Sequence, residues 1–74
     1  MKVFVLTHCA AGKNYTPKVF ADKETAIKNM KELYEDCISV RDFVEINELY
    51  ETNAVIIYID DTYDRFNIFE VNLE

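Results

Sequence analysis

The carboxy-terminal part of the chain predicts a β-hairpin with apolar side chains on both faces, and this constrains the fold more than any other feature. Residues 54–59 form a nearly continuous apolar run rich in β-branched side chains, which predicts a strand over residues 54–60. Turn-like residues with several aspartates follow, and residues 65–73 alternate as a strand does. The apolar side chains of this second strand fall into two sets, one on each face: Phe69, Val71 and Leu73 against Phe66 and Ile68. One helical layer covers only one face, so a second helix, another copy or a partner must shield the other.

The chain has 74 residues, of which 50% are apolar, and a chain of this length forms a single hydrophobic core. We therefore expect one domain over residues 1–74 that holds no large cofactor. No apolar run approaches the roughly 20 residues needed to cross a bilayer, and the short apolar stretch over residues 3–6 is too short for a signal peptide. A cytoplasmic protein without membrane contact is expected, with Cys9 and Cys37 kept as thiols.

The first half of the chain predicts a strand, an optional second strand and a helix. Residues 2–8 carry apolar side chains on both faces and predict a strand. The only glycine and the only proline mark a loop over residues 9–17, after which residues 18–20 are an optional further strand. Asp22 stands at an N-cap position before residues 23–37, where apolar side chains recur at helical spacing. Residues 23–37 are therefore predicted to be an amphipathic helix.

Residues 40–50 have two interpretations. Ser39, three positions before Asp42, resembles a capping box, which predicts a second helix over residues 40–50. Four apolar side chains fall within one helical arc: Phe43, Ile46, Leu49 and Tyr50. Val44 interrupts that pattern, so a strand over residues 43–49 is the alternative. The fold class expected is α+β, with an antiparallel sheet of three to four strands packed by the helix over 23–37.

Charge is distributed unevenly along the chain. Residues 1–41 hold seven bases and five acids, a net charge of +2, whereas residues 42–74 hold nine acids and one base, a net charge of −8. A field of this sign repels nucleic acid and attracts basic surfaces. We therefore expect no direct binding of DNA or RNA, and a basic protein surface as partner.

Most carboxylates of the acidic half are candidate partner-binding groups, together with one aromatic anchor. The candidates are Asp42, Glu45, Glu48, Glu51, Asp60, Asp61, Asp64 and Tyr63. On a helix the first four would trace an acidic stripe about 13 Å long, and the remaining aspartates would form a second cluster at the hairpin tip. Two such clusters can occupy a basic channel that normally holds a nucleic-acid backbone, which would be nucleic-acid mimicry.

No catalytic or metal-binding motif is evident, and we expect a protein that is not an enzyme. The single histidine, His8, is next to Cys9, and adjacent residues of a strand point to opposite faces. The hairpin aspartates lack the glycine and the distant glutamate of an EF-hand, so turn formation explains them better than calcium binding. A small enzyme or metal site that uses His8, Cys9 or these aspartates is kept as an alternative function.

Three stretches resemble small uncharacterised α+β proteins of phages and mobile elements of gut bacteria. They are the opening Lys2 Val3 Phe4 Val5 Leu6 Thr7, the helix entry Val19 Phe20 Ala21 Asp22 Lys23 Glu24 Thr25 Ala26, and the ending Phe66 Asn67 Ile68 Phe69 Glu70 Val71. These motifs are structural and carry no catalytic residue. The resemblance implies a setting in which small acidic proteins inhibit host defence enzymes, including restriction and CRISPR systems, in the host cytoplasm.

The function predicted from the sequence is a small acidic interaction module. It would bind a basic protein surface, such as that of a nucleic-acid-handling host enzyme, and act as an inhibitor or regulator. The alternative is a structural homo-oligomer without catalytic activity, in which the hairpin face carrying Phe66 and Ile68 packs against its own copy.

Overall fold

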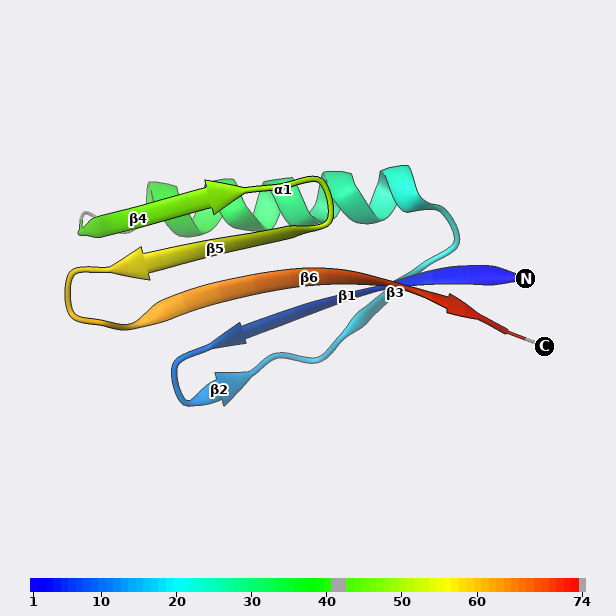
Figure 1. The fold of residues 1–74 in the computed structure, drawn as a ribbon, viewed down its shortest axis with the longest axis horizontal. Coiled ribbons are helices and arrows are strands. Elements are labelled where there is room, and N and C mark those ends of the chain that lie inside the picture. Colours follow the sequence, from blue (N-terminus) through cyan, green and yellow to red (C-terminus); the bar gives the residue numbers. More distant parts are fainter. Residues whose placement is uncertain (41–42, 74) are drawn as a thin grey trace.

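The computed structural model describes residues 1–40 and 43–73 as an α+β domain with one helix and a six-stranded antiparallel sheet (Figure 1). The elements in chain order are β1 (Lys2–Ala10), β2 (Lys13–Asn14), β3 (Lys18–Phe20), α1 (Lys23–Ser39), β4 (Val44–Leu49), β5 (Asn53–Tyr58) and β6 (Tyr63–Asn72). The predicted fold class is confirmed, although the sheet has more strands than the three to four expected. No helix in this described part of the chain is both long enough and apolar enough to span a membrane.

The first and last strands of the chain form the centre of the sheet. The strand order is β2-β1-β6-β5-β4, and β3 also pairs with β1. The β1–β6 ladder is the longest, running from Lys2 opposite Asn72 to Ala10 opposite Asp64. Because β1 and β6 pair antiparallel, the start of β1 lies beside the end of β6 (Figure 1). β4 lies at one outer edge, and β2 and β3 lie at the other.

The predicted hairpin is confirmed as β5 and β6. Its turn contains Asp61 in the left-handed region at φ 67°, a conformation that aspartate tolerates better than most residues. The Asp60 carboxylate accepts hydrogen bonds from the backbone N–H and the hydroxyl of Thr62, at 3.1 and 2.5 Å. These are the contacts of an Asx turn, so both aspartates help to form the turn.

The predicted helix is confirmed with its N-cap. The Asp22 carboxylate accepts a hydrogen bond from the backbone N–H of Thr25 at 2.8 Å, and this bond lowers the pKa of Asp22 below its ordinary value. One stripe of the helix, represented by Ala26, Met30 and Tyr34, is buried against the sheet. The helix contacts β1, β3, β5 and β6, and in Figure 1 it lies behind the sheet.

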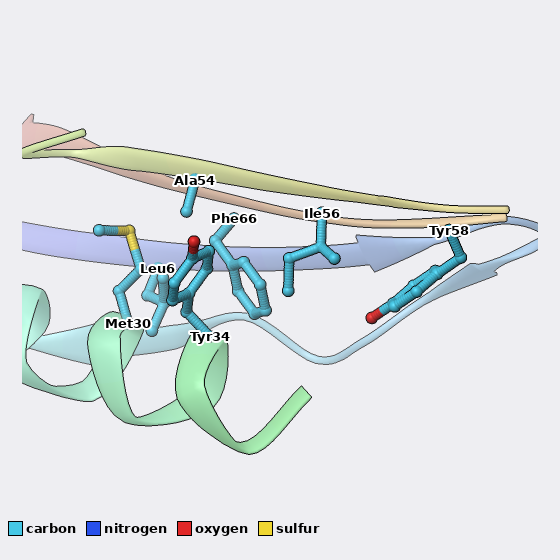
Figure 2. Close-up of a cluster of buried hydrophobic side chains, with 7 residues drawn as sticks. All are labelled: Leu6, Met30, Tyr34, Ala54, Ile56, Tyr58 and Phe66. Atoms are coloured by element: carbon cyan, nitrogen blue, oxygen red, sulfur yellow. The ribbon is translucent and has the colours of Figure 1, made fainter. Parts of the chain in front are cut away.

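The core lies between the helix and one face of the sheet (Figure 2). Seven buried side chains form it: Leu6, Met30, Tyr34, Ala54, Ile56, Tyr58 and Phe66. Ile68 also packs against this cluster. The homo-oligomer alternative named Phe66 and Ile68 as the uncovered face, and this is wrong, because the helix covers them. Phe69, Val71 and Leu73, which are 53%, 38% and 48% exposed, are the set of β6 side chains left uncovered.

The second helix predicted over residues 40–50 is also wrong, and the alternative, a strand over 43–49, is confirmed as β4. Ser39 does not begin a helix but belongs to the last turn of α1, where its hydroxyl donates to the carbonyl of Asp36 at 2.9 Å. Val44, which interrupted the helical pattern, packs against the core and pairs with Tyr58. Hydrogen bonding to β5 therefore outweighs the helical spacing of the apolar residues.

The sheet face away from the helix is built from rows of paired side chains. Near the chain ends the rows are apolar: Val19, Val5 and Phe69 in one, and Val3 with Val71 in the next. A polar row of Thr7, Asn67 and Asn53 crosses the middle. Beyond it lies a second apolar row of Tyr63, Ile57 and Ile46. The sequence predicted that one face of the hairpin would lack a covering layer. This open face is that surface, and it carries Phe69 and Val71 rather than Phe66 and Ile68.

Candidate functional site

Exposed carboxylates gather along the β4 edge of the sheet. Glu45 and Glu48 belong to β4, and Asp60 and Asp61 form the neighbouring hairpin tip. The tip lies beside the start of β4, because the backbone N–H of Ile59 donates to the carbonyl of Phe43 at 2.9 Å. We call the set Glu45, Glu48, Asp60 and Asp61 the acidic edge. At about 3.3 Å per residue, Glu45 and Glu48 are roughly 10 Å apart along the strand.

Three of these four carboxylates lie without a basic neighbour. Among residues 1–40 and 43–73, no lysine or arginine nitrogen lies within 4.0 Å of the carboxylates of Glu45, Glu48 or Asp61. Glu48 instead accepts a hydrogen bond from the Tyr50 hydroxyl, and this bond together with the negative charge raises the pKa of Tyr50. Within the described residues, the carboxylates of Glu45, Glu48 and Asp61 thus form no ion pair.

Two carboxylates of residues 42–74 form ion pairs with lysines of residues 1–41. Glu51, in the turn between β4 and β5, lies 2.8 Å from the Lys23 ammonium group, and Glu70 lies 3.6 Å from that of Lys2. The hydrogen bond from Lys23 lowers the pKa of Glu51, and the same contact raises the pKa of Lys23. Glu51 was predicted as a partner-binding residue, but its charge is already paired within the molecule.

Three predicted site residues remain. One lies outside the described residues, one is half-buried and one is buried. Asp42 lies outside the described residues. The predicted helical stripe is wrong, because Glu45 and Glu48 belong to a strand. Tyr63 is half-buried at the start of β6, with the Arg65 guanidinium 5.6 Å from its ring centre. Asp64 is buried and faces the helix side of the sheet.

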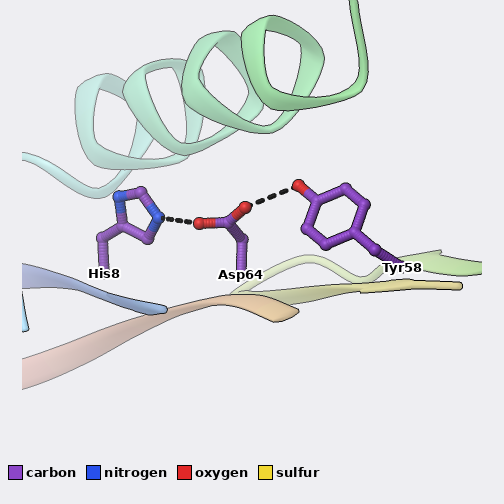
Figure 3. Close-up of polar contacts among 3 residues, drawn as sticks. All are labelled: His8, Tyr58 and Asp64. Carbon is purple, nitrogen blue, oxygen red and sulfur yellow. Dashed lines mark hydrogen bonds and ion pairs between the residues drawn. The ribbon is translucent and has the colours of Figure 1, made fainter. Parts of the chain in front are cut away.

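Asp64 lies at the centre of a buried polar chain that the sequence analysis missed (Figure 3). Its Oδ1 is 2.7 Å from Nε2 of His8, and its Oδ2 accepts a hydrogen bond from the Tyr58 hydroxyl at 2.5 Å. The three residues come from β1, β5 and β6. The side chains of His8 and Asp64 are only 14% and 8% exposed. Since a buried carboxylate is costly unless its oxygens are bonded, this chain explains how Asp64 is accommodated in the core.

The helix adds a cysteine to this chain. A ring nitrogen of His8, the Cys37 sulphur and a carboxylate oxygen of Asp64 all lie within 4.8 Å of one another. We call these three residues the His8–Cys37–Asp64 cluster. Cys9, in contrast, pairs with Arg65 on the open face, and no disulfide links it to Cys37. The expectation that His8 and Cys9 do not converge is therefore confirmed, whereas convergence of His8 with Cys37 was not foreseen.

Aromatic rings hold the His8 imidazole in place. Tyr15 stacks on one side, with ring centres 4.2 Å apart and an angle of 11° between the planes, and Phe66 stacks at 4.3 Å and 27°. Lys13 extends this stack, with its ammonium group 4.6 Å from the centre of the Tyr15 ring. A cavity of about 390 Å³ opens beside the histidine; its lining is Leu6, His8, Tyr15, Thr16, Lys18 and Leu33.

Comparisons with protein-family models, with curated proteins and with solved structures found no match to this chain. The functional interpretation therefore depends on the geometry of the acidic edge and of the His8–Cys37–Asp64 cluster.

Proposed function

We propose that the protein is a small acidic interaction module that binds a basic protein segment along the acidic edge and thereby inhibits or regulates the partner. The observation that carries the proposal is the position of Glu45 and Glu48 on a strand at the edge of the sheet, where no lysine or arginine among the described residues pairs with either carboxylate. An edge strand presents unpaired backbone N–H and C=O groups, to which an extended segment can add as a further strand.

Charge complementarity decides what kind of segment fits. An added strand would lie beside Glu45 and Glu48 and close to the Asp60–Asp61 turn, so lysine or arginine side chains in it would meet negative charge. Ile46 and Ile57, a cross-strand pair on the open face, offer apolar contacts next to these carboxylates. A segment that alternates basic and apolar side chains matches both features, whereas the phosphates of nucleic acid would be repelled.

More specifically, we propose that the partner is a nucleic-acid-handling enzyme, which this protein inhibits. Such enzymes expose lysine and arginine for phosphate binding, and an acidic edge can occupy those side chains in place of the nucleic acid. On this proposal the protein acts without catalysis of its own, in the manner of a nucleic-acid mimic from a phage or mobile element. Competition between the partner's nucleic acid and this protein would distinguish mimicry from binding elsewhere on the partner.

Reversing two charges of the acidic edge is expected to abolish most of the binding. The probe is a peptide of alternating lysine and valine, titrated by isothermal calorimetry into the wild type and into the double variant Glu45→Lys, Glu48→Lys. We expect affinity to fall about tenfold or more, because each reversal replaces an attraction with a repulsion of similar size. Raising salt from about 50 to 500 mM should weaken wild-type binding in the same direction.

The matched control reverses two charges elsewhere. Glu32 and Glu35 are exposed on α1, so Glu32→Lys with Glu35→Lys changes net charge by the same amount without altering β4. This control should bind the peptide nearly as well as the wild type, and a DNA duplex should not bind to the wild type. Equal losses in both double variants, or binding that salt leaves unchanged, would refute the role of the acidic edge.

The exposed apolar rows of the open face support self-association as a second candidate. Phe69 and Val71 remain uncovered, and a second copy would bury them. Sedimentation of the wild type over a hundredfold range of concentration tests this candidate directly, and a monomer throughout would exclude it. If the protein dimerises, Phe69→Asp should make it monomeric.

Removing the carboxylates of β4 is expected to promote self-association through this edge of the sheet. Charged side chains on an edge strand prevent pairing with the edge of another copy. The double variant Glu45→Thr, Glu48→Thr keeps good strand formers but removes that repulsion, so it should form dimers or aggregates at concentrations at which the wild type does not. Light scattering at equal concentration measures the difference. The same variant with unchanged scattering would show that these charges do not protect the edge.

A further inference from the structure

We propose that His8, Cys37 and Asp64 form a binding site for a zinc ion. The three residues come from β1, α1 and β6, and their ligand atoms lie within 4.8 Å of one another. Imidazole nitrogen, thiolate sulphur and carboxylate oxygen are the donors that zinc takes in proteins, whereas calcium and magnesium take oxygen alone. Of the divalent ions, zinc therefore fits this donor set best.

The spacing needs only small adjustments to accept the ion. With zinc bonds of roughly 2.0–2.3 Å at tetrahedral angles, ligand atoms lie about 3.3–3.6 Å apart. His8 Nε2 and Asp64 Oδ1 are hydrogen-bonded at 2.7 Å, so they must separate by roughly 0.7 Å to admit the ion. No two of the ligand atoms are more than 4.8 Å apart, so the approach needed is at most about 1.2 Å, which is within the reach of side-chain rotation at Cys37 on the helix.

The surrounding residues already hold two of the ligands in orientation. The Tyr58 hydroxyl bonds to Oδ2 of Asp64, and this places Oδ1 toward His8 (Figure 3). The rings of Tyr15 and Phe66 fix the His8 imidazole from both sides. Partners of this kind orient metal ligands and reduce the loss of freedom on binding.

Charge and access are also suitable. A thiolate and a carboxylate balance the two positive charges of zinc, so the loaded site would carry no net charge in this largely buried position. Binding requires the Cys37 thiol to lose its proton, which passes to solvent. Of the three ligands only His8 lines the neighbouring cavity, so solvent approaches the cluster from the histidine side. The ion would join the end of α1 to the two central strands.

Cobalt titration of the full chain tests the proposal, since Co²⁺ reports on zinc sites through its absorption. We expect the visible bands of tetrahedral cobalt together with a thiolate-to-cobalt charge-transfer band, both removed by added Zn²⁺. Zinc should also raise the melting temperature. The chain has two cysteines, and Cys9 is half-buried on the opposite face of the sheet, so Cys9→Ser is the matched control for Cys37→Ser. Cys9→Ser should keep the charge-transfer band, and Cys37→Ser should lose it.

Affinity measurements complete the test. Removing a ligand by His8→Gln or Cys37→Ser should weaken zinc binding by more than 100-fold. Tyr58→Phe, which alters a positioning residue only, should weaken it roughly 10- to 100-fold and keep the charge-transfer band. Absence of that band in the wild type, or its loss in Cys9→Ser, would overturn the site. The result is independent of the acidic edge, because Glu45→Lys with Glu48→Lys should bind zinc as the wild type does.

Discussion

Replacing Phe66 by alanine is expected to lower the free energy of unfolding by about 3–5 kcal/mol, a large share of the total stability. Phe66 is fully buried between the sheet and the helix, where its removal leaves a cavity. A domain of 74 residues has a stability of roughly 4–11 kcal/mol at about 0.05–0.15 kcal/mol per residue. Urea denaturation followed by circular dichroism measures the loss.

Phe69→Ala is the matched control, since it removes the same atoms from the open face of the same strand. Phe69 is 53% exposed, so the free energy of unfolding should fall by about 1 kcal/mol or less. Comparable losses for both variants would mean that something covers the open face in solution. A larger loss for Phe69→Ala would reverse the assignment of the two faces of β6.

Replacing Asp64 by alanine is expected to cost about 2–5 kcal/mol, the second-largest effect we foresee. Without the carboxylate, the His8 ring and the Tyr58 hydroxyl lose the bonds that they make with it in a largely dry environment. Asp64→Asn should cost less, because its amide can still bond to both groups. The measurement is made in the presence of a chelator, so that a bound metal ion does not contribute.

A double-mutant cycle separates this chain from simple loss of packing. We expect Tyr58→Phe to destabilise the wild type but to have little effect in the Asp64→Ala background, with a coupling energy of about 0.5–3 kcal/mol. Additive effects of the two substitutions would show that the hydroxyl and the carboxylate do not depend on one another.

The elements with strong local signals were predictable from the sequence. Asp22 marks the start of α1, and the β-branched run with its aspartate turn marks the β5–β6 hairpin. The segment 44–49 was not predictable in the same way, because its apolar residues satisfy a helical spacing as well as a strand. Pairing with β5, a contact made only after folding, determined the outcome. The two-residue strand β2 is too short to leave any periodic pattern.

The candidate site was predictable as a list of charges but not as a surface. Register and helix position decide that Glu51 meets Lys23 and that Asp64 is buried, and neither follows from composition. One signal was overlooked. Asp64 shares its strand face with Phe66, and His8 shares its face with Leu6, so two polar side chains occupied core positions and needed partners. Cys37 could not be added from sequence, since its position depends on how α1 crosses the sheet.

The central β1–β6 ladder, in which Lys2 lies opposite Asn72, has a consequence for synthesis of the protein. Almost the whole chain must be looped before these two strands can meet, and pairing of distant residues is intrinsically slow. While a ribosome makes the chain, α1 and the β5–β6 hairpin have no complete sheet on which to pack. We therefore expect cooperative acquisition of the native state only after the last strand has emerged, which makes the nascent polypeptide a natural substrate for chaperones.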